Sequence, residues 1–301
     1  MKKNAITLTP GTTIIAHGDG DGTIAAAICR LAGANGRLIT TQPFGLAKLA
    51  DLTGPAVVVD IAVDNKSPQA TLDWASRNAA HITLWFDHHT GSEPLAEILG
   101  ERFVYDPTAP SCPTLMAENG FGVPVAWVEA ANACDRPTDY AQTALSTRYN
   151  SAFTVALVAL QNGDRNAVET VQAAFIEELV TGELSPLVSK LEGDYPVLEA
   201  TTLAAIERIE KFYYPEFGSV EVDGQGSVDM TSLLIGGYKK YPTVIVPTIS
   251  ADNEKVIVVG TNKKDLNLVK IFNLGSGNPS RILLTGNEAS LDYVKMCFGF
   301  M

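Results

Sequence analysis

Three short apolar segments of this sequence each end in residues that commonly bind metal ions. The segments and the residues that follow them are 12–16 with His17, Asp19 and Asp21, 57–59 with Asp60, and 82–86 with Asp87, His88 and His89. Imidazole and carboxylate ligands without thiolate suit Mn²⁺, Mg²⁺, Co²⁺ or Fe²⁺. The residues lie far apart in the chain, so they form one site only if the fold brings the segment ends together.

The spacing His17-x-Asp19-x-Asp21 suits a cation. In an extended segment, residues i, i+2 and i+4 face the same side. The interleaved glycines allow the backbone to bend tightly around an ion. Residues 23–28 look like the start of a helix, whose free N–H groups would face an anion beside the metal.

Each of these motifs also has a purely structural explanation. The glycine-rich segment is typical of a turn or a calcium-like loop, Asp60 of a helix cap, and His88-His89 of exposed or structural histidines. The combination, in this order and with each motif at the end of a predicted strand, favours a metal site.

Strands and helices alternate over the first 110 residues. The apolar, β-branched runs 12–16, 56–59 and 82–86 predict strands, and residues 23–31, 68–78 and 93–99 predict helices. This alternation is typical of an α/β fold, with a parallel sheet and helices on both of its faces. The carboxyl ends of parallel strands share one edge, where ligands bind. The fold would therefore gather the candidate ligands.

The remaining chain predicts a helical region followed by a second, smaller α/β domain. Helical spacing recurs at 112–119, 124–134, 151–161, 166–181 and 197–212, strand signals at 219–223, 243–249 and 255–260, and further helices at 263–273 and 288–296. We expect a metal-binding catalytic domain over residues 1–195, a helical linker over 196–218 and a C-terminal substrate-binding domain over 219–301.

Charge and composition exclude several classes of protein. The formal net charge is −12, and residues 220–301, with eight basic and eight acidic residues, contribute none of it. An acidic chain of this kind does not coat long nucleic acids by electrostatics. The acidic residues of the first part either form a solvated surface or hold cations.

The four cysteines are widely spaced and form no CxxC pair, which excludes a zinc ribbon. They suit a reducing compartment, and the sequence has neither a signal-peptide core nor an apolar stretch of 18 residues. We expect a cytoplasmic protein.

The ordered motifs resemble the DHH phosphoesterase superfamily. His17-Gly18-Asp19-Gly20-Asp21-Gly22, then Asp60, then Asp87-His88-His89 follow the family's order over residues 12–140. The family includes RecJ-like exonucleases, family II pyrophosphatases, exopolyphosphatases, nanoRNA phosphatases and cyclic-dinucleotide phosphodiesterases. The resemblance implies a fourth acid in the following helical segment, for which Asp135 is the first candidate and Asp139 the rival.

The resemblance also implies two divalent ions, usually Mn²⁺. His17, Asp19 and Asp60 would hold one ion, and Asp21, Asp60, His88 and Asp135 the other, so that four carboxylates balance two dications. The ions would activate a water that attacks phosphorus. Asp60, His88 and His89 would then be catalytic, with His89 on the phosphate. Asp87 would either orient a histidine or cap a turn. Arg136 would either bind a phosphate or form a surface ion pair.

The segment Gly275-Ser276-Gly277-Asn278-Pro279-Ser280-Arg281 only loosely resembles the glycine-rich GGGH loop of the family's substrate domain. Asn278 stands where a histidine or arginine is expected. As a substrate loop it would use Gly275, Gly277, Asn278 and Arg281, supported by Lys263 and Lys264. A plain turn is the alternative.

Residues and resemblance together predict a metal-dependent phosphoesterase acting on a small phosphorylated substrate. A nucleotide phosphate or a short single-stranded oligonucleotide fits best, with no membrane and no obligate protein partner. An inorganic pyrophosphatase or exopolyphosphatase is the alternative, and a non-catalytic nucleotide-binding regulatory protein is a third hypothesis.

Overall fold

The computed structural model describes residues 6–161, 163–164, 166–224, 227–250, 253–272 and 280–299. The chain separates into two compact units. Met1–Phe153 and Val168–Lys190 form the first, and Thr154–Ala167 and Leu191–Met301 form the second. Residues 196–218, expected to link two domains, lie within the second unit.

The first unit contains a five-stranded, all-parallel sheet in the order β2-β1-β3-β4-β5. Its strands are β1 (Thr13–Ala16), β2 (Leu38–Thr40), β3 (Ala56–Val59), β4 (Ile82–Asp87) and β5 (Phe103–Tyr105). The parallel α/β fold predicted from the sequence is confirmed.

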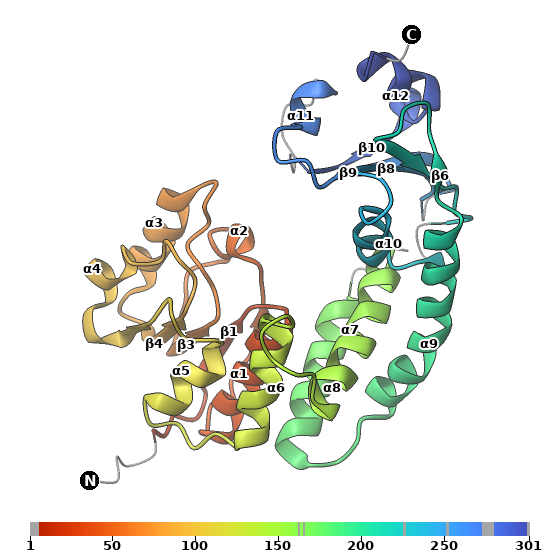
Figure 1. The fold of residues 1–301 in the computed structure, drawn as a ribbon. Helices are drawn as coiled ribbons and strands as arrows, with labels where there is room; N and C mark the ends of the chain where they lie inside the picture. Colours follow the sequence, from red (N-terminus) through yellow and green to blue (C-terminus); the bar gives the residue numbers. More distant parts are fainter. Residues whose placement is uncertain are drawn as a thin grey trace. The chain divides into compact units, whose positions relative to one another are not determined.

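Helices cover both faces of this sheet (Figure 1). On one face lie α1 (Gly20–Leu31), α5 (Cys112–Glu118) and α6 (Val125–Asp135), and on the other α2 (Pro43–Leu46), α3 (Pro68–Asn78) and α4 (Leu95–Leu99). Alternate strand residues supply the two cores: Ile14 and Val57 face the first layer, Ile15 and Val58 the second. Burial on both faces explains the uninterrupted apolar strands.

Three longer helices follow: α7 (Ala144–Gln161), α8 (Ala167–Thr181) and α9 (Pro186–Glu207). Arg148 on α7 joins α8 through Glu178, with Nε–Oε1 at 2.8 Å and Nη2–Oε2 at 3.0 Å. Both side chains are largely buried, so this two-point ion pair holds the helices in a fixed register. None of the helices in the described ranges combines the length and apolar character that a bilayer span requires.

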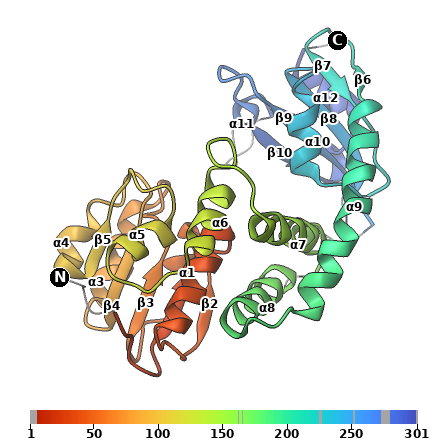
Figure 2. The same cartoon turned by 60° about the horizontal axis from the view of Figure 1, so that its bottom comes forward.

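The second unit contains a mixed sheet in the order β10-β9-β8-β7-β6, in which only the β7–β8 pair is parallel (Figure 2). Its strands are β6 (Glu210–Lys211), β7 (Phe217–Ser219), β8 (Thr243–Ile249), β9 (Lys255–Thr261) and β10 (Arg281–Leu284). One face packs on α9 and α10 (Met230–Gly237), the other on α11 (Leu268–Ile271) and α12 (Leu291–Cys297).

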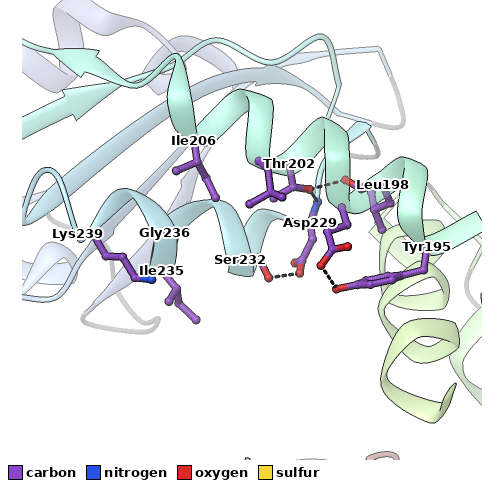
Figure 3. Close-up of a pocket in the computed structure, with 11 residues that line it drawn as sticks. Tyr195, Leu198, Thr202, Ile206, Asp229, Ser232, Ile235, Gly236 and Lys239 are labelled. Atoms are coloured by element: carbon purple, nitrogen blue, oxygen red, sulfur yellow. Dashed lines mark hydrogen bonds between the residues drawn. The ribbon is translucent and has the colours of Figure 1, made fainter. Parts of the chain in front are cut away.

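Helices α9 and α10 approach closely beside a cavity of about 260 Å³ (Figure 3). A Cβ atom on Gly236 would lie 2.5 Å from Ile206 Cδ1, so the glycine permits this contact. Asp229 begins α10 by accepting the Thr231 N–H, and its own N–H donates to Thr202 Oγ1 on α9 at 2.8 Å.

The start of α1 differs from the sequence-based expectation. The helix begins at Gly20, not Thr23, because Asp19 caps it by accepting the Gly22 N–H. Gly20 then lies in the first turn against α6, where a Cβ atom would overlap the side chain of Cys134.

Two helical glycines therefore predict opposite effects of substitution by alanine. We expect Gly20→Ala to destabilise the protein by about 1–3 kcal/mol, because the added methyl overpacks a buried contact. Gly193 lies within α9 with nothing near its absent Cβ. Gly193→Ala should stabilise by about 0.5–1 kcal/mol through helix propensity. Urea unfolding of both variants measures the two signs, and a stable Gly20→Ala protein would contradict the close α1–α6 contact.

Candidate functional site

The candidate ligands gather because three strands of the first sheet end in register. Ala16 pairs with Val59, and Val59 pairs with Phe86. The ladder continues past the strand ends, since the His17 N–H donates to the Val59 carbonyl and the Asp60 N–H to the Phe86 carbonyl. His17, Asp60 and Asp87 therefore stand side by side at the carboxyl edge of the sheet.

Seven side chains form one continuous cluster at this edge. They comprise three groups whose ligand atoms lie within 4.8 Å of one another: His17, Asp19 and Asp60; Asp60, His88 and His89; Asp21, His88 and Asp135. The structure thus brings together all six residues that the sequence suggested as metal ligands, together with His89. Asp60 and His88 each belong to two groups, so the groups are joined through shared residues.

Asp60 lies between two histidines. Its Oδ2 is 3.6 Å from His17 Nδ1, and its Oδ1 is 3.3 Å from His88 Nε2. His17 Nδ1 is also 2.6 Å from Asp19 Oδ2, and His88 Nε2 is 3.4 Å from Asp21 Oδ2. One carboxylate oxygen of Asp60 therefore faces each half of the cluster, which is the arrangement a bridging ligand needs.

Several buried atoms at the centre of the cluster lie near ionisable groups but make no contact of hydrogen-bond geometry with the described residues. They are His17 Nδ1, His88 Nε2 and both carboxylate oxygens of Asp60. Buried polar atoms are normally paired, and each unpaired one costs free energy. Since these orphaned atoms converge from three strand ends, the donor set fits divalent cations.

His17 and His88 are each held so that one ring nitrogen faces the cluster. His17 Nε2 lies 2.8 Å from Gln42 Oε1, and His88 Nδ1 lies 3.1 Å from the Ala109 carbonyl oxygen. Both partners accept, so each of these ring nitrogens carries the proton. A metal ion would replace the proton on the opposite nitrogens, His17 Nδ1 and His88 Nε2, which is the usual arrangement of a ligating histidine.

His89 is held differently. Its Nδ1 lies 2.7 Å from Asp87 Oδ1, and its side chain is 37% exposed. The same Asp87 oxygen accepts the backbone N–H groups of His88 and His89. Asp87 therefore performs both roles considered from the sequence: it orients a histidine and it closes the turn after β4. His89 presents its ring at the surface beside the buried cluster.

Asp21 reaches the cluster from a helix, so the expected extended His-x-Asp-x-Asp geometry is wrong. It occupies the first turn of α1, and its Oδ2 accepts the Cys112 N–H at 3.0 Å. Gly22 follows it, where a Cβ atom would lie 2.7 Å from the His17 carbonyl oxygen and 2.9 Å from Asp60 Oδ2. This glycine allows α1 to approach the strand ends; it does not bend the chain around an ion.

The pKa values of the cluster are shifted because several carboxylates lie close together. Burial, together with the charges of Asp21 and Asp19, raises the pKa of Asp60 well above its usual value. Burial alone would lower the pKa values of His17 and His88, but their neighbouring carboxylates raise both to about 11. For His89, Asp87 and Asp60 outweigh burial and raise the pKa to about 9. Divalent cations would supply the positive charge that protons otherwise supply here.

The remaining predicted residues lie as follows. Asp135 joins the cluster, whereas the exposed Asp139 accepts a hydrogen bond from Thr138 Oγ1 and belongs to none of the three groups. Arg136 Nε lies 3.8 Å from Asp135 Oδ2, and its Nη2 donates to the Ala109 carbonyl, which is also the partner of His88.

In the second unit, Arg281 begins β10 and donates to Thr231 Oγ1, and Lys263 pairs with Glu216 at 3.5 Å. Lys264 lies in the turn between β9 and α11. Gly275, Gly277 and Asn278 lie outside the described residues.

Sequence reasoning missed the residues that support His17. Gln172, fully buried on α8, donates from Nε2 to the His17 carbonyl at 2.7 Å and accepts from Thr40 Oγ1. Its one signal in the sequence is a glutamine on an otherwise apolar helix face. Gln42, which holds the His17 ring through its side-chain oxygen, was missed as well. The Ala109 carbonyl, which holds His88, carries no sequence signal, since a backbone oxygen is present at every residue.

Several solved structures of named proteins share this architecture. The pGpG-specific phosphodiesterase PggH from Vibrio cholerae superposes with a TM-score of 0.63, at 15% identity, over 96% of this chain and 98% of that one. The chain therefore shares the fold of this protein, as its resemblance to the DHH superfamily led us to expect. RecJ from Thermus thermophilus, solved with Mn²⁺, matches with a TM-score of 0.50 and 12% identity over 95% of this chain, which spans 51% of RecJ.

The DHH fold also occurs in CDC45 from Entamoeba histolytica, with a TM-score of 0.58 and 10% identity over 98% of this chain and 95% of that one. No protein-family model and no curated protein sequence matches the chain. A fold supports different functions, so the function of this chain has to be argued from its site.

The backbone conformation of Asp60 leads to a prediction about the stability of two variants. Its φ angle is +61°, in the left-handed region that asparagine and aspartate tolerate and alanine does not. We expect Asp60→Asn to be more stable than Asp60→Ala by about 1 kcal/mol. Urea unfolding of both variants in EDTA measures this difference in stability. Equal stability of the two variants would contradict a left-handed conformation at this position.

Proposed function

We propose that the chain is a metal-dependent phosphoesterase that hydrolyses short oligonucleotides or nucleotide phosphates. The observation that carries the proposal is the set of orphaned, buried imidazole and carboxylate atoms that converge on Asp60. The names of two structures that share the fold, a pGpG-specific phosphodiesterase and RecJ, support phosphoester chemistry.

Two divalent cations fit the cluster. One would be held by His17, Asp19 and Asp60, and the other by Asp21, Asp60, His88 and Asp135, whose ligand atoms the structure gathers. Mn²⁺ suits this donor set, and Mg²⁺, Co²⁺ and Fe²⁺ are alternatives. When bound, such a pair supplies a water nucleophile at neutral pH and positive charge for the phosphoryl oxygens.

In this proposal, the chain's own residues orient the ligand rings and donate a proton to the substrate around this centre. Asp87 fixes the His89 ring through Nδ1, so His89 can donate from Nε2 to a phosphate oxygen or to the leaving oxygen. Gln42 and Ala109 hold the His17 and His88 rings, which preorganises the site. Arg136, whose Nε lies 3.8 Å from Asp135 Oδ2, is the candidate cation for a phosphate at this edge of the cluster.

The catalytic role belongs to residues 1–195 in this proposal. We keep residues 219–301 as the substrate-binding part, with Arg281 and the segment 275–278 as its candidate contacts. The cysteines are free thiols, which suits a reducing cytoplasm.

Metal binding is the first consequence to measure. We expect isothermal titration of metal-free protein with Mn²⁺ to give two ions per chain, and Mn²⁺ at 100 times its Kd to stabilise the fold by about 2.7 kcal/mol for each ion bound. Asp60→Asn should lose most of that stabilisation, because Asp60 faces both halves of the cluster. Asp139→Asn is the matched control and should bind like the wild type. Equal Mn²⁺ binding by Asp60→Asn would overturn the ligand assignment.

Activity is the decisive test. With Mn²⁺ and a 5′-phosphorylated dinucleotide, we expect release of nucleoside monophosphate, resolved chromatographically from orthophosphate. Asp60→Asn should lower kcat/KM more than about 100-fold, beyond the range that loss of a supporting partner produces. Asp139→Asn should keep wild-type activity.

Other products would redirect the proposal. Orthophosphate released from pyrophosphate or polyphosphate, with no dinucleotide cleavage, would replace it by a pyrophosphatase or exopolyphosphatase. Tight nucleotide binding without any turnover would replace it by a regulatory role.

A further inference from the structure

A cavity of about 400 Å³ opens beside the histidine–carboxylate cluster within the first unit. Three chain segments line it: Pro43 and Phe44 at the start of α2, residues 62–66 after β3, and His89 with Thr90 after β4. Two of these segments continue directly from Asp60 and from the Asp87–His89 turn. Since His89 Nδ1 lies 3.9 Å from Asp60 Oδ1, the cavity and the cluster share His89 as a common wall.

Phe44 is the unusual part of the lining. Its side chain is 60% exposed, although α2 is anchored on both sides of it. Gln42 caps the helix and binds His17, and Leu46 is fully buried in the core. The helix thus holds a large aromatic ring mostly in solvent next to the site. Lys48 Nζ lies 5.6 Å from the ring centroid.

The charged residues of the cavity favour an organic phosphate over an inorganic one. Lys66, an exposed lysine, supplies a cation in a chain whose net charge is −12. Asp64 also lines the cavity, and its Oδ1 accepts the Lys66 backbone N–H at 3.1 Å. A carboxylate repels pyrophosphate but accepts hydrogen bonds from the N–H groups of a base. An aromatic ring, a carboxylate and a lysine together suit a nucleotide.

We propose that this cavity is a nucleoside subsite, in which a base of the substrate stacks on Phe44 while Lys66 holds an adjacent phosphate and His89 meets the scissile one. The inference rests on the proposed function and narrows the class of substrate, because only a substrate with a base can stack on Phe44. Stacking on an aromatic side chain tolerates any base, so the subsite favours nucleotides in general.

The test compares intact and abasic substrates. With a 5′-phosphorylated dinucleotide, Phe44→Ala should lower kcat/KM about 5- to 100-fold, mostly through KM. Phe44→Tyr should restore most of the loss. With dinucleotides that lack one base or the other, the wild type should show a similar loss for one of the two, and Phe44→Ala should add little to it. Leu31→Ala, which removes an exposed side chain at the far end of α1, is the control and should behave like the wild type.

The outcomes separate the subsite from the activity. An equal loss on intact and abasic dinucleotides, or no loss at all, would overturn the subsite while leaving the phosphoesterase intact. If the wild type cleaves nothing, a dinucleotide containing 2-aminopurine tests the subsite by binding alone. Fluorescence quenching that Phe44→Ala abolishes would support the subsite without the activity, and quenching unaffected by the substitution would reject it.

Discussion

The candidate site depends on one constraint: a fully buried carboxylate, Asp60, must be balanced by positive charge where three parallel strands end. Its neighbours Asp21 and Asp19 add negative charge, and its backbone adopts the left-handed conformation. Burying uncompensated carboxylates is costly, and strained backbone persists only where the surroundings hold it in place. The register of β1, β3 and β4, the cap at Asp19 and the glycine at position 22 together hold this arrangement.

The three histidines of the cluster share one feature. Each has one ring nitrogen held by an acceptor: Gln42 for His17, the Ala109 carbonyl for His88 and Asp87 for His89. For His17 and His88 the other nitrogen is buried and faces carboxylates, whereas the His89 ring is partly exposed. The same chemical group thus occurs in two settings: two rings face the buried carboxylates, and the third is partly open to solvent.

Most of the cluster could be predicted from the sequence, because its members follow apolar runs whose strand character and parallel pairing are strongly encoded. β3 and α3 were expected at the residues where they lie. The three-residue strands β2 and β5 were missed because their runs are too short to show a period. The start of α1 was misplaced because the sequence alone did not show that Asp19 is a cap. Gln172 supports a residue 155 positions away, which no local pattern shows.

Substrate choice has a different physical origin from the metal cluster. In the proposed function, the metal-loaded cluster would provide charge and a nucleophile for any phosphate that reaches it, and CDC45 shows that the same fold occurs in a protein not named for hydrolysis. Selectivity must therefore come from side chains that the ions do not need. In the first unit, Phe44, Asp64 and Lys66 meet that condition beside His89, and they lie on segments that begin at Gln42 and Asp60. Because the same segments carry both sets of residues, positioning the cluster also positions the cavity, and a nucleotide is the ligand that uses all three side chains.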